Sequence, residues 1–193
     1  EIFASASLSP SSVDFSSYVR GWTGLDITFG RFFWNSLVIS LLVVAGNVIA
    51  CSLTAFAFAR LRFPGRDKLF LLYLGTLMIP GQVTLIPNFL LMSWLGWVDS
   101  YAALIIPAAF SAFGTFLLRQ FFLSIPPELE QAARMDGCSY FGIYRHIILP
   151  LSGPALATLA VFAFMTQWNA FLWPLIVANK ETMRTLTVGI RYF

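Results

Sequence analysis

Long apolar segments alternate with short polar connections along most of the chain. A helix needs roughly 20 predominantly apolar residues to cross the hydrocarbon core of a bilayer, which is about 30 Å thick. Four segments meet this length: residues 34–59, 69–95, 101–118 and 155–178. Residues 1–32 mix Ser, Gly, Asp and Thr with apolar residues and predict an extramembrane segment. The pattern predicts an all-α fold in which residues 33–193 form a polytopic bundle of transmembrane helices.

The composition agrees with that of an integral membrane protein. Hydrophobic residues make up 58% of the chain and charged residues 11%, against about 25% charged in a typical soluble domain, and the mean hydropathy is +0.77. Too little polar sequence remains to cover four such segments in water. The net charge is +3, but the basic residues are scattered over short connections. We therefore expect no nucleic-acid partner.

The distribution of basic residues predicts an orientation, because Lys and Arg favour the cytoplasmic side. The connection 60–68 is strongly basic, so we expect it in the cytoplasm. The connection 96–100 contains no Lys or Arg and suits the opposite face, and the polar stretch 119–150 then returns to the cytoplasm. Residues 1–32 and 179–193 fall outside, although the second of these segments is itself basic.

Two predicted spans contain proline and amide side chains within their apolar sequence. Such groups at membrane depth face protein or a water-filled cavity rather than lipid. For each residue alone, hydrogen bonds that merely hold the bundle together are an equally good explanation. Taken together they favour a solute pathway, in which amides bind hydroxyl groups and indole rings stack on sugars. The candidate pathway residues are Gln82, Asn88, Gln167, Trp168, Asn169 and Trp173.

Residues 124–150 are too polar to span a membrane and predict a helix, a turn and a second helix. Gly137 can take the left-handed conformation that ends a helix, and Ser139 can cap the next one. The second helix carries an apolar stripe, and Pro150 is expected to stop it. The first helix could lie in a groove on a soluble partner. A helix that rests on lipid headgroups is the alternative, but the acidic residues here disfavour it.

Within this segment, small residues, an acid and a glycine are followed after nine residues by apolar residues and a proline: Ala132, Ala133, Asp136, Gly137, Ile147, Leu149 and Pro150. In residue types and spacing the pattern resembles the cytoplasmic EAA loop of binding-protein-dependent ABC importer permeases. Residues 116–122 and 167–175 are similar to the carbohydrate branch, in particular its maltose-permease-like second subunit. The chain departs from the family at Gln131, where Glu is usual, and at Cys138, where Ala is usual.

The resemblance implies that residues 124–150 are a coupling loop that docks on a separate ATPase. The ATPase-coupling residues it implies are Glu130, Gln131, Ala132, Ala133, Asp136, Gly137, Ile147, Leu149 and Pro150. It also implies a pair of ATP-binding subunits that hold ATP and Mg²⁺, a second related permease, an extracytoplasmic solute-binding protein and a place in the bacterial cytoplasmic membrane. Members of this kind usually have six spans, so we expect one span before Glu1 and one after Phe193.

The chain itself predicts no catalysis. It contains no Gly-x-x-x-x-Gly-Lys-Ser/Thr phosphate loop, and Lys68 and Lys180 lie in no such context. We expect neither an enzyme nor a cofactor here, and no catalytic residue. His146 is the only histidine, which argues against a metal site. Cys51 lies in an apolar segment and Cys138 in a polar one, so we expect no disulfide between them.

The sequence therefore predicts a permease subunit that forms the translocation pathway for a sugar or oligosaccharide in an ATP-driven importer. Glycerol 3-phosphate or a glycerophosphodiester is an alternative substrate, because such importers share this branch. The absence of Lys and Arg from the middle of every predicted span favours a neutral solute. An ion-driven secondary transporter also uses broken helices, but it would need acids or histidine within the spans. A structural membrane protein does not explain the coupling-loop spacing.

Overall fold

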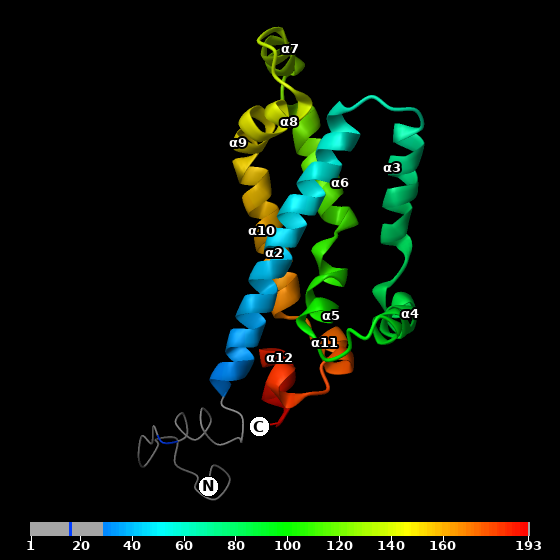
Figure 1. The fold of residues 1–193 in the computed structure, drawn as a ribbon, viewed down its shortest axis with the longest axis vertical. Coiled ribbons are helices and arrows are strands. Elements are labelled where there is room, and N and C mark those ends of the chain that lie inside the picture. The colour runs from blue at the N-terminus through cyan, green and yellow to red at the C-terminus, as the bar shows by residue number, and fades with distance from the viewer. Residues whose placement is uncertain (1–15, 17–28, 193) are drawn as a thin grey trace, which may run out of the picture.

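The computed structural model describes residue 16 and residues 29–192, and every regular element in this part is helical. The main helices are α2 (Phe29–Arg60), α3 (Arg66–Gly75), α4 (Gly81–Trp94), α5 (Tyr101–Ile105), α6 (Ala112–Ser124), α7 (Pro127–Met135), α8 (Tyr140–Ile143), α9 (Leu149–Leu151), α10 (Gly153–Trp168), α11 (Leu172–Val177) and α12 (Leu186–Gly189). They form an elongated bundle with α2 along its length (Figure 1). The prediction of an all-α fold is confirmed. Residues 1–15 and 17–28, most of the predicted extramembrane segment, lie outside the described residues.

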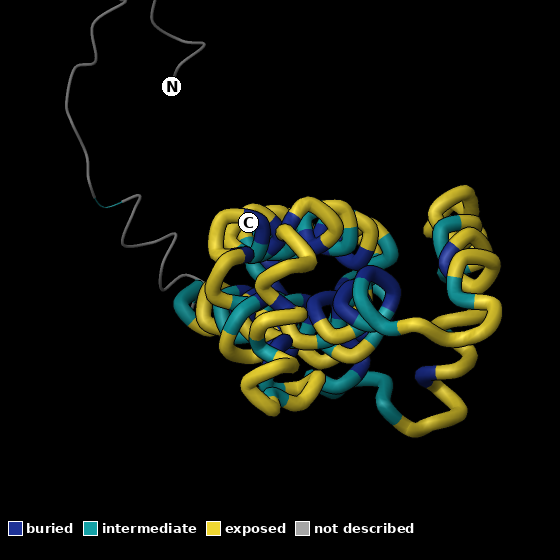
Figure 2. Tube along the Cα trace, turned by 90° about the horizontal axis from the view of Figure 1, so that it is seen from above, coloured by how far each residue is buried: buried dark blue, intermediate teal, exposed yellow. Residues whose placement is uncertain are grey.

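Helix α2 is the central element, and its burial pattern is that of a helix in lipid. Its buried positions include five polar residues: Asn35, Ser36, Ser40, Asn47 and Ser52. Large apolar residues of the same helix are exposed, among them Trp34, Leu41 and Ile49. Figure 2 shows exposed positions around the outside of the bundle and buried ones between the helices. Polar groups therefore face other helices, where all of these except Ser40 form hydrogen bonds, and apolar groups face outward.

Two helical stretches in the described part are long and apolar enough to cross a membrane, Phe29–Arg60 and Tyr101–Ser124. Two bent pairs raise the number to four: Arg66–Met78 with Gly81–Trp94, and Tyr140–Leu151 with Gly153–Trp168. The bends are 98° and 78°. The predicted span boundaries stay predictions, because helix bounds alone do not locate a membrane.

Three of the four predicted spans are interrupted. Helix α3 continues through a 3₁₀ turn, Thr76–Met78, and the chain then bends before Pro80, which cannot donate a backbone hydrogen bond. The third span breaks at a second 3₁₀ turn, Pro107–Ala109, between α5 and α6. The fourth breaks between α10 and α11, around Asn169. In contrast, α2 runs without a break for 32 residues.

Small residues let the interrupted elements approach α2 closely. A Cβ on Gly46 would lie 2.7 Å from the Cβ of Ala109, in the broken third span. A Cβ on Gly114 would lie 2.7 Å from a methyl group of Leu159 in α10. Real side-chain atoms do not approach so closely, so a side chain at Gly46 would push α2 away from Ala109, and one at Gly114 would require Leu159 to move.

Candidate functional site

A cavity of about 370 Å³ lies where three interrupted elements meet. It is lined by α4, by the turn before α6 and by the junction of α10 with α11: Gly81, Gln82, Thr84, Leu85, Asn88, Pro107, Ala108, Gln167, Ala170, Leu172 and Trp173. We call it the broken-span cavity. None of these described lining residues is charged. The cavity brings together four of the six candidate pathway residues, Gln82, Asn88, Gln167 and Trp173, from segments far apart in the sequence.

The amides in the broken-span cavity are available to a ligand. The side chains of Gln82, Asn88 and Gln167 form no hydrogen bond with any other described residue. Trp173 differs, because its Nε1 donates to the carbonyl oxygen of Ala103 at 2.9 Å, which fixes the indole in place. The cavity therefore combines three uncommitted amides with one immobilised aromatic ring.

A second cavity of about 230 Å³ shares Ala108 and Gln167 with the first and reaches Asn47 on α2. The amide of Asn47 donates to the carbonyl oxygen of Ala108 at 2.7 Å and to that of Val43 at 3.2 Å. The bond to Ala108 satisfies a backbone carbonyl group that the break in the third span leaves without a helical partner. Asn47 therefore holds the interrupted segment against the straight helix, and Gln167 lies between the two cavities.

The remaining two candidate pathway residues do not line the broken-span cavity. The ring of Trp168 packs against Phe33 and Phe164, with ring centroids 5.5 Å apart in each pair. The side chain of Asn169 is exposed and donates to the carbonyl oxygen of Met165, 2.7 Å away in the preceding turn. Sequence position alone placed them with Gln167, but helical rotation separates neighbouring side chains.

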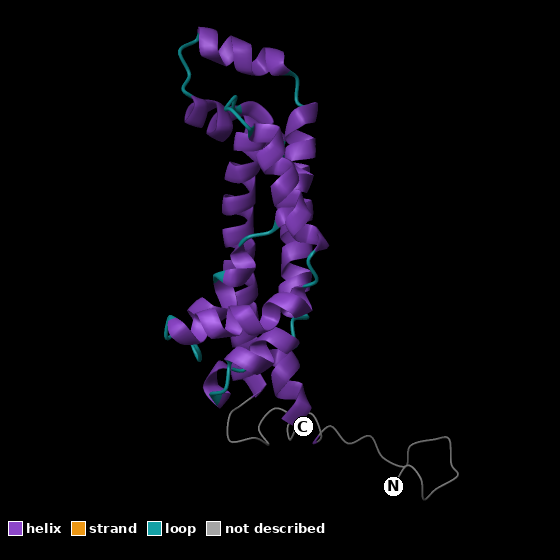
Figure 3. Ribbon diagram, turned by 90° about the vertical axis from the view of Figure 1, so that its right-hand side faces the viewer, coloured by secondary structure: helices purple, strands orange, loops and turns teal. Residues whose placement is uncertain are grey.

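The predicted helix, turn and helix of residues 124–150 is present in the structure, and α7 lies beyond the ends of the other helices (Figures 1 and 3). Gly137 follows α7 with φ +79°, the left-handed conformation expected there. The hydroxyl of Ser139 accepts from the backbone N–H of Gly142 at 3.2 Å and caps the next helix. That helix does not stop at Pro150, because a π-helical turn, Tyr144–Ile148, leads into α9, which ends at Leu151.

The implied coupling residues fall into three groups by exposure. Gln131, Ala132, Asp136, Gly137 and Pro150 are exposed. Ala133, Ile147 and Leu149 are half-buried, and Ala133 and Leu149 pack against the hydrophobic cluster between α2, α6 and α10. Glu130 alone among these described positions is buried.

Glu130 forms an ion pair that the sequence did not predict. Its Oε1 lies 2.9 Å from Nε of Arg60, the last residue of α2, and the two side chains are 12% and 9% exposed. Arg60 also donates to the carbonyl oxygens of Phe122 and Ile125, at the end of α6. An acid at the start of a helix interacts favourably with the helix dipole, which already accounts for Glu130 in α7. No local sequence pattern linked it to a residue in another helix.

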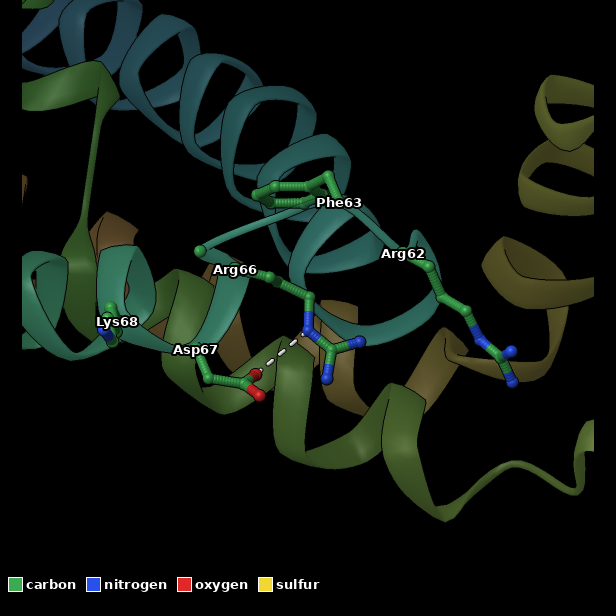
Figure 4. A pocket seen from close by; sticks show the side chains of 6 residues that line it. Arg62, Phe63, Arg66, Asp67 and Lys68 are labelled. Carbon is green, nitrogen blue, oxygen red and sulfur yellow. Dashed lines mark hydrogen bonds and ion pairs between the residues drawn. The ribbon is translucent and has the colours of Figure 1, made fainter.

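The connection from α2 to α3 contributes further charged contacts, shown in Figure 4. Nε of Arg66 lies 3.0 Å from the carboxylate of Asp67, whereas Arg62 points away from this pair. On the other side, the guanidinium of Arg119 lies 4.1 Å from the centre of the Phe70 ring and 3.9 Å from Asp67. These contacts hold the start of α3 beside α6.

Known proteins resemble this chain over most of its length. Residues 22–193 match the family described as "binding-protein-dependent transport system inner membrane component". The permease protein UgpE of the sn-glycerol-3-phosphate transport system of Brucella abortus is 41% identical over 167 residues, which cover 86% of this chain and 59% of that protein. The permease protein AraQ of the arabinooligosaccharides transport system of Halalkalibacterium halodurans is 39% identical over 181 residues, covering 94% and 64%.

A solved structure shares the fold. It is the crystal structure of a bacterial ABC transporter involved in the import of the acidic polysaccharide alginate. The match has a TM-score of 0.87 and 30% sequence identity, and it covers 95% of this chain and 64% of that one. The chain thus spans about three fifths of the length of the proteins it resembles.

Proposed function

Because the chain belongs to the binding-protein-dependent transport system inner membrane component family, we propose that it is the membrane-spanning permease subunit of an ATP-driven importer. The observation that carries this proposal is the broken-span cavity. Three interrupted helical elements converge on it, and interrupted helices within a membrane occur where the backbone is buried in protein or lines a water-filled cavity, as it does here. An ion-driven secondary transporter gains no support, because the described lining has no acid or histidine.

The cavity supports a neutral, hydroxyl-rich solute such as a sugar or oligosaccharide. Uncommitted amides can donate to and accept from hydroxyl groups, and they carry no charge that would require a counter-ion. The immobilised indole of Trp173 offers an apolar face for a sugar ring. The likeness to the arabinooligosaccharide permease AraQ agrees with this substrate class.

Glycerol 3-phosphate is the second candidate substrate. It is favoured by the 41% identity to UgpE. Against it stands the uncharged lining, because a phosphate buried away from water needs basic groups or several N–H donors. A second permease or a binding protein would have to provide them.

The proposal includes partners. The exposed residues of α7 would dock on one of a pair of ATP-binding subunits, which hold ATP and Mg²⁺ and hydrolyse the nucleotide. A second related permease would complete the pathway, and an extracytoplasmic solute-binding protein would deliver the solute. The assembly would lie in the bacterial cytoplasmic membrane, with α7 on the cytoplasmic side.

The test is uptake by the full-length protein, reconstituted with its ATPase, second permease and binding protein in proteoliposomes. ATP-dependent uptake of a labelled oligosaccharide supports the first candidate substrate, and uptake of labelled glycerol 3-phosphate alone supports the second. Replacing Gln167→Ala removes about one hydrogen bond to solute and is expected to lower uptake about three- to tenfold. Asn169→Ala is the matched control, since that amide bonds within its own helix. Absence of ATP-dependent uptake of either solute would contradict the proposal.

A further inference from the structure

Helix α7 presents an acid to the rest of the chain and apolar side chains to solvent. Residues three apart share a helix face, so Leu129, Ala132 and Met135 form one face, and all three are exposed, Met135 by 89%. Glu130 and Ala133 form the face toward the protein body, and Glu130 is the one buried residue of α7 in the described part. The contact of α7 with the spans is therefore made by one buried carboxylate and one half-buried alanine.

That carboxylate meets a guanidinium that already donates two hydrogen bonds to the end of α6. Nε of Arg60 contacts Glu130 at 2.9 Å. Its terminal nitrogen donates to the carbonyl oxygen of Ile125 at 2.6 Å and to that of Phe122. The planar guanidinium can make these contacts together, which a lysine ammonium on a flexible chain does not reproduce. Arg60 thus joins the end of α2, the end of α6 and the start of α7.

A purely stabilising role explains this arrangement poorly. Two buried charges are generally no more stable than a well-packed apolar pair of the same size. Neither Nε of Arg60 nor Oε1 of Glu130 forms a hydrogen bond with a described residue, so the contact between them is electrostatic. Moving α7 away from the end of α2 would leave both charges buried and unpaired, which constrains where α7 lies. Here the pair holds α7, which lies beyond the ends of the other described helices (Figure 3).

We infer that Arg60 and Glu130 are positioning residues for energy coupling, an inference that rests on the proposed function. Their ion pair orients α7 so that Leu129, Ala132 and Met135 face the ATPase. When the ATPase moves α7, the pair transmits the displacement to α2 and α6 together. Without it α7 can still bind the ATPase, but its movement is no longer passed on to the spans.

The experiment measures solute uptake and ATP hydrolysis in the same proteoliposomes and compares their ratio. Glu130→Gln removes the charge but keeps the shape, and it leaves the bonds of Arg60 to α6 intact. We expect the ATPase to co-purify, because the exposed apolar face of α7 is unchanged, and uptake per ATP hydrolysed to fall about tenfold. Arg60→Gln is expected to lower the ratio by at least as much. Asp67→Asn is the matched control, because Asp67 is an exposed acid that pairs with Arg66 outside α7, and its ratio should not change.

Each outcome bears on the inference. An unchanged ratio in both Glu130→Gln and Arg60→Gln would overturn it. So would loss of the Glu130→Gln subunit from the membrane, because the pair would then serve folding alone. If only the Arg60→Gln subunit fails to accumulate in the membrane, the inference is judged from uptake per ATP hydrolysed in Glu130→Gln alone. A lowered ratio supports it, and an unchanged ratio overturns it. A wild-type complex that imports neither solute would refute the proposed function rather than this inference.

Discussion

The two ends of α2 hold a neighbouring segment in different ways. At its Asn35 end, the amide of Asn35 donates to the carbonyl oxygens of Thr182 and Arg184 at 2.8 and 2.9 Å, and accepts from the hydroxyl of Tyr101 at 2.9 Å. The hydroxyl of Ser36 accepts from the backbone N–H of Leu186 at 2.8 Å. At its Arg60 end, one ion pair and the packing of Ala133 hold α7.

The segment at the Asn35 end has further attachments of the same kind. The carboxylate of Asp99 accepts from the backbone N–H groups of Asn179 and Lys180, the latter at 2.9 Å. Met183, Thr185 and Val188 are buried. In each of these bonds the segment 179–186 contributes backbone atoms, so substitutions within the segment leave the bonds in place.

The difference shows which segment is part of the rigid body and which is an attached adaptor. Several neutral bonds to backbone atoms make 179–186 a fixed extension of the bundle. Helix α7 keeps its apolar face free and depends on the side chains of Arg60 and Glu130. We therefore expect a single substitution to loosen α7, whereas loosening the other segment should require the loss of several bonds.

The largest expected effect is that of Arg60→Ala. It leaves the Glu130 carboxylate buried without a counter-charge, which costs about 3–5 kcal/mol. We expect amide hydrogen exchange of residues 127–135 to rise by two to three orders of magnitude in the detergent-solubilised protein, at about 1.4 kcal/mol per decade. Exchange of 179–186 should stay as it is. If α7 exchanges equally fast in the variant and the parent, the Arg60 end of α2 does not hold its neighbour through a single ion pair, and the proposed difference from the Asn35 end is wrong.

Asn35→Ala is expected to have a smaller effect at the opposite end. It removes three hydrogen bonds, each contributing about 1 kcal/mol net, so about 2–3 kcal/mol is lost locally. Hydrogen exchange should increase in 179–186 by one to two orders of magnitude. The bonds from Ser36 and Asp99 should keep the segment attached. Complete loss of protection there would mean that this end too depends on one side chain.

The smallest effect is expected for Asp67→Asn. This variant tests whether an exposed ion pair near α7 contributes as much stability as the buried Arg60–Glu130 pair. Asp67 is 74% exposed as a side chain, and surface pairs contribute about 0–1 kcal/mol. We expect the thermal midpoint to move by less than about 2 °C and exchange in α7 to be unchanged. A shift as large as that of Arg60→Ala would show that burial is not what distinguishes the Arg60–Glu130 pair.

Length and hydropathy sufficed to locate the helices, because these properties depend on local sequence. The predicted first span lies within α2, and Gln82 and Gln167 lie next to a bend or break, whereas Asn88 lies inside α4. Proline interrupts a helix wherever it removes a needed donor. The cavity that unites Gln82, Asn88 and Gln167 follows from those same interruptions.

Features that depend on contacts between distant segments were not predictable. The break before α6 is held by Asn47 of another helix, and nothing near Pro107 shows this in the sequence. Trp168 was assigned to the pathway from its neighbours, but its orientation follows from packing against Phe33. The burial of Glu130 likewise depends on Arg60 reaching it from α2. Acids near the start of a helix are usually exposed, so the sequence pattern alone predicts that Glu130 faces solvent, whereas it is buried.

The outward-facing apolar side chains of α7 also have a consequence for how the cell handles this subunit. A copy made in excess of its partner would show Leu129 and Met135 to water, and exposed apolar patches of this kind favour aggregation. The same residues that would complete an assembled complex would therefore mark an orphan copy for chaperones and proteases. Removal of excess copies, recognised by the exposed apolar residues of α7, would keep the amounts of the subunits balanced.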